Sequence, residues 1–328
     1  MRFLKRFSLI VATTAVLLAT YFWLLSPVNT NPTKIEFQIT KGQSVGEISS
    51  NLQKLGLVRS ALLLKTYLYV TGLHKQIQAG YFYLSPSENL TQISQDLTHA
   101  VTKDVRVTIP EGLRHEEIAN LILDTLVTTK LPNRFDADLF IRKTATLEGQ
   151  LYPDTYSLSP GITTDQVINL LTSQFVKVIS SLAIPPANQK QVVVLASILE
   201  RETATDAERP EVAGILLNRI NGNWPLQVDA TVQYALSSSR CRNRLCIWWP
   251  RPLTKTYLQI NSPLNTYLYT GLPISPISNP GQKSLAAAAR PNKTTNWFYL
   301  HDASGQIHYA ATVEQHNQNI CLYLKKDC

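Results

Sequence analysis

Residues 191–204 read QVVVLASILERETA, and this stretch decides the fold of the larger part of the chain. Every position from Val192 to Leu199 is apolar except Ser197, which predicts a helix that is buried on all sides. Two carboxylates, Glu200 and Glu202, close this helix. Residues two apart lie about 200° apart around a helix axis, so the two carboxylates cannot line one cleft.

A carboxyl group on such a helix tends to have a raised pKa, because burial disfavours its charged form. It could then stay protonated near neutral pH and act as a general acid. The alternative is a solvated helix end at which both carboxylates pair with Arg201 or Arg209. Taken alone, the pattern favours this second interpretation.

Polar residues follow the carboxylate helix. A second helix is expected from Pro210, a favoured first-turn residue, to Asn221-Gly222, with Asn218 and Arg219 in its last turn. Gln227 and Asp229 then interrupt an apolar stretch. Residues 261–281, NSPLNTYLYTGLPISPISNPG, offer neutral hydrogen-bonding groups and aromatic rings. Such a loop suits uncharged polar ligands such as sugars, unless it is only a long structural loop.

The N-terminus contains a candidate membrane span. Residues 7–25 carry no charge, and as a helix they reach about 28 Å, close to the hydrocarbon thickness of a bilayer. Arg2, Lys5 and Arg6 precede this run, so we expect the N-terminus to be cytoplasmic. The alternative is a cleaved signal peptide. Both interpretations place the chain from about Asn29 onward outside the cytoplasm. We favour the retained membrane anchor over the cleaved signal peptide.

Three short segments share one pattern, a strand, a turn and a helix start: residues 39–52, 84–97 and 108–122. The first resembles a LysM-like module through Lys41, Gly42, Ser44, Glu47 and Ile48. That resemblance implies a small βααβ module that binds glycan strands. A compact spacer that binds nothing is the alternative.

The four cysteines, outside the cytoplasm, are possible disulfide partners, and three connectivities are open. We favour the two local pairs, Cys241 with Cys246 and Cys321 with Cys328. A zinc site is the weakest alternative, because the cysteine spacing lacks a second tight pair and a nearby histidine. His301, His308 and His316 do not have the spacing of a helical metal-binding pair, so we expect no metal site.

The net charge of +8 is modest for 328 residues and does not require a polyanionic partner. Arginines interleave with Trp248 and Trp249 in residues 237–252, a pattern found in nucleic-acid binding. An extracytoplasmic segment makes nucleic acid an unsuitable partner. We expect this segment to be a loop at the rim of a cleft, with the tryptophans either stacked on sugar or packed inward. No nucleophile elbow or nucleotide-binding glycine motif is present in the sequence, and no cofactor is expected.

Seven motifs in order resemble the endolytic murein transglycosylase (YceG-like) family. They are LEGQLYPDTY, LASILERET, LLNRI, LQVDATVQY, SPLNTYLYTGLP, PISNPGQKSLAAA and HYAATVEQHN. The resemblance covers nearly the whole chain and is densest from Leu147 to Asn317. It departs from the family pattern at Ala230, Leu264 and Ile274-Ser275, and residues 237–252 have no close counterpart.

The resemblance implies a membrane-anchored enzyme that cleaves the MurNAc–GlcNAc β-1,4 bond within peptidoglycan strands and leaves 1,6-anhydro-MurNAc ends, limiting the length of nascent strands. It assigns catalysis to Glu202, the second carboxylate of the E-x-E-T motif. It implies substrate-binding positions at the following residues: Glu200, Asn218, Arg219, Gln227, Asp229, Asn265, Tyr267, Asn279 and Gly281. Implied partners are peptidoglycan strands and cell-wall synthesis proteins such as penicillin-binding proteins.

The sequence therefore predicts an α+β protein of the cell (inner) membrane. The expected parts are a cytoplasmic tip (1–6), a single transmembrane helix (7–25), a linker (26–34), a LysM-like βααβ module (35–104) and a mixed α+β catalytic module (105–328). Two other functions stay open: a non-catalytic peptidoglycan-binding scaffold, and a water-using muramidase with Asp229 as its second carboxylate.

Overall fold

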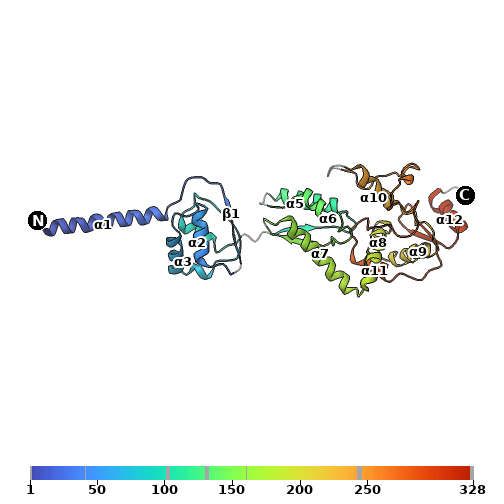
Figure 1. Ribbon diagram of the computed structural model, residues 1–328, viewed down its shortest axis with the longest axis horizontal. Coiled ribbons are helices and arrows are strands. Elements are labelled where there is room, and N and C mark those ends of the chain that lie inside the picture. Colours follow the sequence, from blue (N-terminus) through green and yellow to red (C-terminus); the bar gives the residue numbers. More distant parts are fainter. Residues whose placement is uncertain are drawn as a thin grey trace. The chain divides into compact units, whose positions relative to one another are not determined.

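The computed structural model describes residues 2–40, 42–100, 104–129, 133–159, 161–241 and 246–325. The chain divides into two compact units, Met1–Asp104 and Val105–Cys328, and each has a hydrophobic core of its own. Helices dominate, as the ribbon shows (Figure 1). The described strands form three two-stranded sheets. The predicted α+β class is confirmed.

The first unit contains α1 (Arg2–Leu25), β1 (Ile35–Ile39), α2 (Val45–Lys54), α3 (Ala61–Val70), β2 (Gly80–Leu84) and α4 (Leu90–Asp96), with a short 3-10 turn, η1 (Leu73–Lys75). β1 and β2 pair in antiparallel fashion, with Phe37 opposite Phe82. Ser44 begins α2 with a capping box to Glu47, and Ile48 and Leu52 of that helix are buried. The order of β1, α2, α3 and β2 is the βααβ order; the LysM-like assignment stays a prediction.

The membrane span also stays a prediction. Among the described residues, no single helix is both long and apolar enough to cross a bilayer. Thr13–Leu25, within α1, is a shorter apolar helical stretch. The helices α7 (Thr164–Ser181) and α8 (Pro186–Glu202) meet the criterion only as a pair bent by 111°. Most of their apolar residues are buried in the cores of the second unit.

The first half of the second unit packs α5 (His115–Thr128), α6 (Ala137–Thr144) and α7 around an antiparallel pair of strands, β3 (Val105–Thr108) and β4 (Thr155–Leu158). The core of this half includes Ile118, Phe140 and Leu171, which are almost completely buried. Thr163 starts α7 with a capping box to Gln166.

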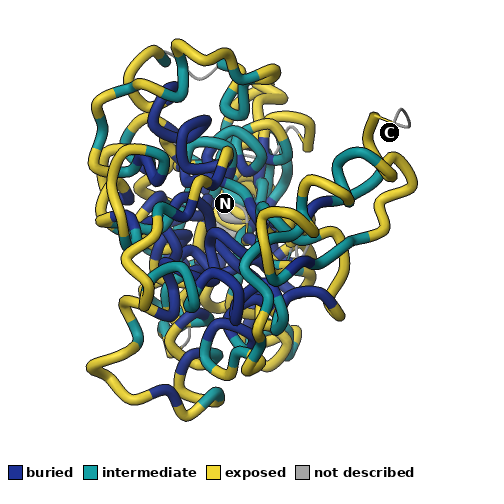
Figure 2. Tube along the Cα trace, turned by 90° about the vertical axis from the view of Figure 1, so that its right-hand side faces the viewer, coloured by how far each residue is buried: buried dark blue, intermediate teal, exposed yellow. Residues whose placement is uncertain are grey.

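The second half is built around α8. It adds α9 (Arg209–Asn221), α10 (Asp229–Arg240), η2 (Tyr257–Gln259), α11 (Gln282–Ala289), the hairpin of β5 (Phe298–His301) and β6 (Ile307–Ala310), α12 (Val313–Asn319) and the π-helical turn η3 (Ile320–Lys325). All residues from Val192 to Leu199 are buried, as predicted. The helix begins five residues before the predicted Gln191, at Pro186. The described residues of α12 and η3 are intermediate or exposed (Figure 2).

The three predicted strand–turn–helix segments are confirmed as β1 with α2, β2 with α4, and β3 with α5. Each helix starts with a backbone N–H of the cap residue bound by the side chain three positions later: Glu47, Gln92 or Glu117. The repeated pattern in the sequence therefore reflects a repeated way of starting a helix.

Candidate active site

A groove of about 1040 Å³ lies in the second unit where α8, α9 and α10 meet the β5–β6 hairpin. Among the described residues, fourteen line it: Arg201, Glu202, Arg219, Gln227, Asp229, Gln233, Arg251, Pro252, Leu253, Tyr267, Phe298, Tyr299, His301 and His316. Five of the predicted site residues are among them: Glu202, Arg219, Gln227, Asp229 and Tyr267.

Glu202 is the last residue of α8, where the buried helix reaches the groove. Burial raises the pKa of its carboxyl above the ordinary value, and the negative charge of Asp229 acts in the same direction. The hydrogen bond from Tyr299, together with the positive charges of His301 and Arg219, offsets part of this rise. The net effect favours a protonated carboxyl facing the groove.

Tyr299, in β5, donates its hydroxyl to Glu202 Oε2 at 2.9 Å. Burial beside the Glu202 carboxylate raises the pKa of Tyr299 well above its usual value, so this phenol stays a neutral donor. The hydrogen bond fixes one oxygen of the carboxyl group and leaves Oε1 without a hydrogen-bond partner in the described structure. Strand β5 is thus the element that orients Glu202.

Asp229 begins α10, and its Oδ1 accepts a 2.6 Å hydrogen bond from the hydroxyl of Tyr267. Burial and this bond raise the pKa of Tyr267. Gln227, two residues earlier, has a φ of 53°, in the left-handed region that residues other than glycine seldom adopt. Its backbone N–H binds Thr266 O at 3.0 Å, and its side chain is exposed in the groove.

Arg219, near the end of α9, lines the groove and binds two backbone segments next to it. Its Nε donates to Trp297 O at 2.9 Å and its Nη1 to Leu226 O at 2.6 Å. Burial lowers the pKa of Arg219, while Tyr299 and Glu202 counteract that effect. The guanidinium thus joins the segments before α10 and β5 and places a positive charge near Glu202.

His301 supports the same strand. Its Nε2 lies 3.0 Å from Glu208 Oε2, and its ring meets Tyr299 edge to face. Burial works to raise the pKa of Glu208, but the hydrogen bonds from His301 and Thr205 outweigh it and leave the pKa lowered. The pair ties β5 to the start of α9.

Glu200 lies outside the groove lining, in agreement with the helix geometry. Its Oε1 accepts from Arg209 Nη2 and its Oε2 from Gly281 N, both at 2.9 Å. The side chain is only 6% exposed. An added Cβ at Gly281 would overlap the Glu111 carboxyl, so a side chain there would require the exposed Glu111 side chain to move. Glu200 thus connects α8 to α9 and α11.

The structure does not bring the three predicted asparagines to the groove either. Asn218 donates to the carbonyls of Thr294 and Asn296. Asn265 is completely buried and holds two carbonyls of the loop before it. Asn279 binds Leu113 O, Leu151 N and the Glu148 carboxylate. Each amide fixes the backbone of neighbouring segments.

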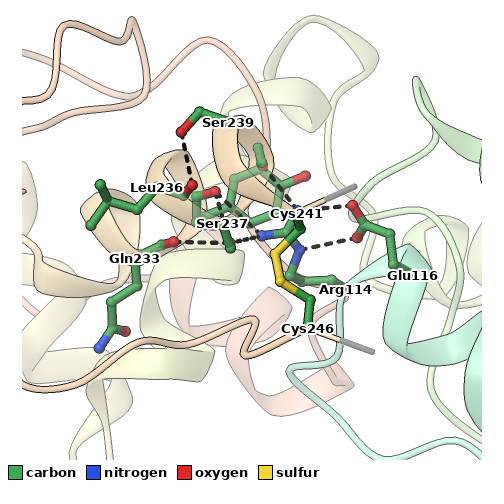
Figure 3. Close-up of a disulfide and its surroundings, with 10 residues drawn as sticks. Arg114, Glu116, Gln233, Leu236, Ser237, Ser239, Cys241 and Cys246 are labelled. Atoms are coloured by element: carbon green, nitrogen blue, oxygen red, sulfur yellow. Dashed lines mark hydrogen bonds and ion pairs between the residues drawn. A yellow bond between two sulfur atoms is a disulfide. The ribbon is translucent and has the colours of Figure 1, made fainter. Parts of the chain in front are cut away.

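The arginine-rich loop after α10 is attached at several points. Cys241 and Cys246 form a disulfide, and Gln233 donates to Pro250 O at 3.1 Å. Arg114 reaches from the start of α5 to Ser237 in α10 and makes a bidentate pair with Glu116 (Figure 3). Cys321 is also disulfide-bonded, whereas Cys328 lies outside the described residues, as does the 242–245 segment.

The two tryptophans of this loop pack inward. Trp249 lies under the guanidinium of Arg201, with 3.8 Å from Cζ to the ring centroid, and its Nε1 donates to Glu117. Trp248 lies beneath Arg114 at 4.7 Å. Neither tryptophan is among the described residues that line the groove, whereas Arg251 and Leu253 are.

One group in the described residues has the proximity of metal ligands: His115, Glu116 and Glu148. Its atoms already bind one another and their neighbours, with His115 Nδ1 at 2.8 Å from Glu148 Oε2 and the Tyr234 hydroxyl at 2.9 Å from the same oxygen. This cluster lies at the start of α5, apart from the groove lining. His308 pairs with Asp302, while His301 and His316 line the groove.

Three residues of the groove lining were not predicted from the sequence: Gln233, Tyr299 and Phe298, which precedes Tyr299 in β5. Gln233 and Tyr299 each carry a polar group between apolar neighbours in the sequence. No other sequence feature could have indicated them.

Comparison with known proteins places this arrangement in a family. The model of the YceG-like family matches residues 37–321. A Bacillus subtilis (strain 168) protein named endolytic murein transglycosylase is 30% identical over an alignment of 322 positions, and the match covers 90% of this chain and 86% of the relative. A Streptococcus pneumoniae (strain D39) protein of the same name is 24% identical, and the match covers 92% of this chain but 60% of that relative.

The crystal structure of a YceG-like protein from Listeria monocytogenes is similar in fold, with a TM-score of 0.52 and 26% sequence identity. The match covers 87% of this chain and 98% of that one. Because the family model spans most of the sequence, including the groove, this chain belongs to the YceG-like family.

Proposed function

We propose that this chain is an endolytic murein transglycosylase that cleaves the MurNAc–GlcNAc β-1,4 bond within peptidoglycan strands and leaves a 1,6-anhydro-MurNAc end. Its relatives from Bacillus and Streptococcus bear this name, which supports the reaction class. One structural observation carries the assignment to a residue: Glu202 lines the groove with a raised pKa and one oxygen held by Tyr299.

The first chemical step breaks the bond between the MurNAc C1 and the glycosidic oxygen. Burial favours the protonated form of Glu202, and from this form Glu202 gives its proton to that oxygen as the bond breaks. Positive charge then develops on the sugar ring, and the ionised Glu202 and Asp229 both lie in the groove to stabilise it.

The second step closes the anhydro ring. The C6 hydroxyl of the same MurNAc attacks C1 and gives its proton to the Glu202 carboxylate, which restores the acid. No water enters, so one carboxyl group can serve in both steps. General acid–base catalysis of this kind contributes roughly 10²–10⁴-fold in rate. Attack from within the same sugar adds a proximity advantage.

The remaining lining of the groove fits a sugar strand. Gln227, Gln233 and Tyr267 offer neutral donors and acceptors, and Phe298 offers an aromatic ring. Such mixed polar and aromatic surfaces are typical of sites in which a few polar groups fix the orientation of a ligand.

The location of the reaction is part of the proposal. Residues 7–25 would anchor the chain in the cell membrane, with the second unit outside the cytoplasm, where peptidoglycan lies. Enzymes that synthesise glycan strands, such as penicillin-binding proteins, are the partners this location suggests.

Hydrolysis is the second candidate, because Asp229 lies in the same groove and its charge raises the pKa of Glu202. A muramidase would use Asp229 to activate water, as glycosidases with paired carboxylates do. The hydrogen bond from Tyr267 occupies one Asp229 oxygen, which favours a stabilising role over proton abstraction.

The first test replaces Glu202 by Gln in the full chain and measures the shortening of purified glycan strands. Glu202→Gln removes the proton donor, so we expect cleavage to fall by roughly 10²-fold or more while the fold is retained. Asp124→Asn, an exposed substitution on α5, is the matched control and should keep full activity.

Glu200→Gln provides the contrasting variant. It weakens the buried pair with Arg209, so it should lower the melting temperature while the folded fraction still cleaves strands. A Glu200→Gln protein that is stable and inactive, beside an active Glu202→Gln protein, would reverse the assignment.

A further inference from the structure

Two arginines in the groove wall have no role in the mechanism above. Arg201 precedes Glu202 on α8, and Arg251 lies in the loop that follows the disulfide. Both line the groove. They lie close enough that the charge of Arg251 contributes to lowering the pKa of Arg201, for which burial is the larger cause. Two like charges this close disfavour each other unless an anion joins them.

Neither guanidinium has a carboxylate partner in the part of the chain that the structure describes. The one hydrogen bond of Arg201 is a marginal 3.5 Å contact from Nη1 to Gly112 O. Its Nε is buried and has no hydrogen-bond partner. Arg251 is exposed and makes no hydrogen bond or ion pair within the described ranges. Arg219, by contrast, uses its donors on two backbone carbonyls.

The surroundings of Arg201 hold it in place without neutralising it. Trp249 stacks on the guanidinium at 3.8 Å and is itself fixed by its hydrogen bond to Glu117. The carboxylates that act on Arg201 at longer range are Glu117, Glu200 and Glu202. Glu117 accepts from Trp249 and caps α5, Glu200 is paired with Arg209, and burial favours the neutral form of Glu202.

The loop likewise holds Arg251 at the groove. Gln233, itself in the groove lining, binds the carbonyl of Pro250, immediately before Arg251. The disulfide and the contacts of Arg114 with α10 secure the start of the same loop (Figure 3). A planar guanidinium with free donors in a fixed position is suited to binding a carboxylate through two parallel hydrogen bonds.

We propose that Arg201 and Arg251 form a carboxylate-binding subsite, which recognises an acidic group carried by the glycan strand beside the bond that is cut. This proposal rests on the proposed function. Two carboxylates of the substrate have the required chemistry. Strands without peptides expose the lactyl carboxylate of MurNAc, and strands with peptides carry the carboxylates of the peptide stem.

The test measures the KM for strand shortening by the full chain, whatever ends the products carry. Three substrates are compared: peptide-free strands, peptide-bearing strands, and peptide-free strands whose carboxylates have been converted to amides. The variants are Arg251→Gln, Arg251→Lys and Arg201→Gln. Arg106→Gln, an exposed arginine on β3, is the control with the same change of charge and should keep the wild-type KM.

We expect the wild-type chain to prefer a carboxylate-bearing strand over the amidated strand by about tenfold in KM, the value of one charge-assisted interaction. Arg251→Gln should remove this preference, and Arg251→Lys should retain part of it. Added salt should weaken the preference in the wild type. A preference confined to peptide-free strands assigns the lactyl carboxylate, and one confined to peptide-bearing strands assigns the stem.

A wild-type chain that cleaves all three substrates with equal KM overturns the subsite and leaves the proposed function intact. The subsite is also overturned if Arg251→Gln keeps the full preference. A chain that shortens no strand overturns the proposed function and the subsite together. Because Arg251 is exposed and makes no hydrogen bond or ion pair within the described ranges, its variants separate recognition from folding, which Arg201→Gln alone would not.

Discussion

Glu200 and Glu202 acquire different roles from their surroundings although they lie two residues apart on α8. The negative charge of Glu200 is balanced by the Arg209 guanidinium and by a hydrogen bond from the Gly281 N–H. Within the described residues, the Glu202 carboxyl accepts a hydrogen bond only from the neutral Tyr299 hydroxyl, and it faces the groove. Burial is therefore the largest influence on its pKa and raises it. Helix spacing predicted that the two could not share a cleft, and the structure confirms it. The family motif alone does not explain the difference.

Tyr299→Phe tests whether the Tyr299 hydroxyl orients the Glu202 carboxyl and lowers its pKa. The hydrogen bond stabilises the ionised carboxyl, so its loss raises the pKa of Glu202 further. Activity that needs the protonated acid falls as the pH rises through this pKa. The alkaline limb of the pH–kcat profile should therefore move to higher pH, and kcat should fall about tenfold because the carboxyl is no longer oriented.

Tyr309→Phe is the matched control, because Tyr309 lies directly opposite Tyr299 in the β5–β6 ladder. It should leave the profile unchanged. A Tyr299→Phe chain with an alkaline limb at the wild-type pH or below would contradict the orientation of Glu202 described above.

Residues that reach the groove from distant segments were beyond prediction from the sequence. Tyr299 is 97 positions from Glu202, and no local pattern around WFYLH indicates which of its residues meets a carboxylate. Leu264, a departure from the family pattern, packs against the core around α8, so the change leaves a hydrophobic contact in place.

At the level of helices and strands, prediction depended on local signals. The helix starts at residues 45, 90 and 115 follow cap residues with a partner three positions later, and these could be predicted. The partners of the strands could not. β3 pairs with β4, about fifty residues later, because their buried residues share one core, and a register of that kind has no local signature.

The hydrogen bond from the Gly281 N–H to Glu200 joins the start of α11 to α8. Gly281→Ala tests this contact. The added Cβ would overlap the Glu111 carboxyl next to the N–H that binds Glu200. Glu111 is an exposed side chain that can move aside, so we expect a loss of only up to roughly 1 kcal/mol in the free energy of unfolding, measured by denaturant titration, in part because alanine is a poorer N-cap residue than glycine.

Gly46→Ala, on α2, is the control, since the nearest atoms to an added Cβ are 3.9 Å away. It should be neutral or stabilise the chain by up to roughly 1 kcal/mol, as alanine does in helices. Equal destabilisation by the two substitutions would show that the close approach at Gly281 is not what matters.

The disulfide after α10 closes a loop of only a few residues, with a sequence separation of 5. Replacing Cys241 and Cys246 by serine together should cost about 2 kcal/mol of stability, the value expected for constraining so short a loop in the unfolded chain. Thermal unfolding of the second unit measures it. A double variant as stable as the wild type would mean that Arg114 and Gln233 suffice to hold the loop.

On the scale of the whole molecule, the chain combines two units with separate cores, and the described groove belongs entirely to the second. The order of elements in the first unit could be predicted because strand and helix signals alternate within a short segment. The groove could be predicted only in part. Glu202 could be predicted from the motif, whereas the described lining residues come from seven separate segments that only tertiary packing brings together.

In the proposed mechanism one carboxyl group, that of Glu202, cleaves the strand without water. The most direct measurement is the mass of the glycan ends produced by the full chain, beside its Glu202→Gln variant. We predict ends one water lighter than hydrolysis products, and their loss in the variant. Hydrated ends would contradict the claim in favour of Asp229-assisted hydrolysis, and anhydro ends that persist in Glu202→Gln would remove Glu202 from the chemistry.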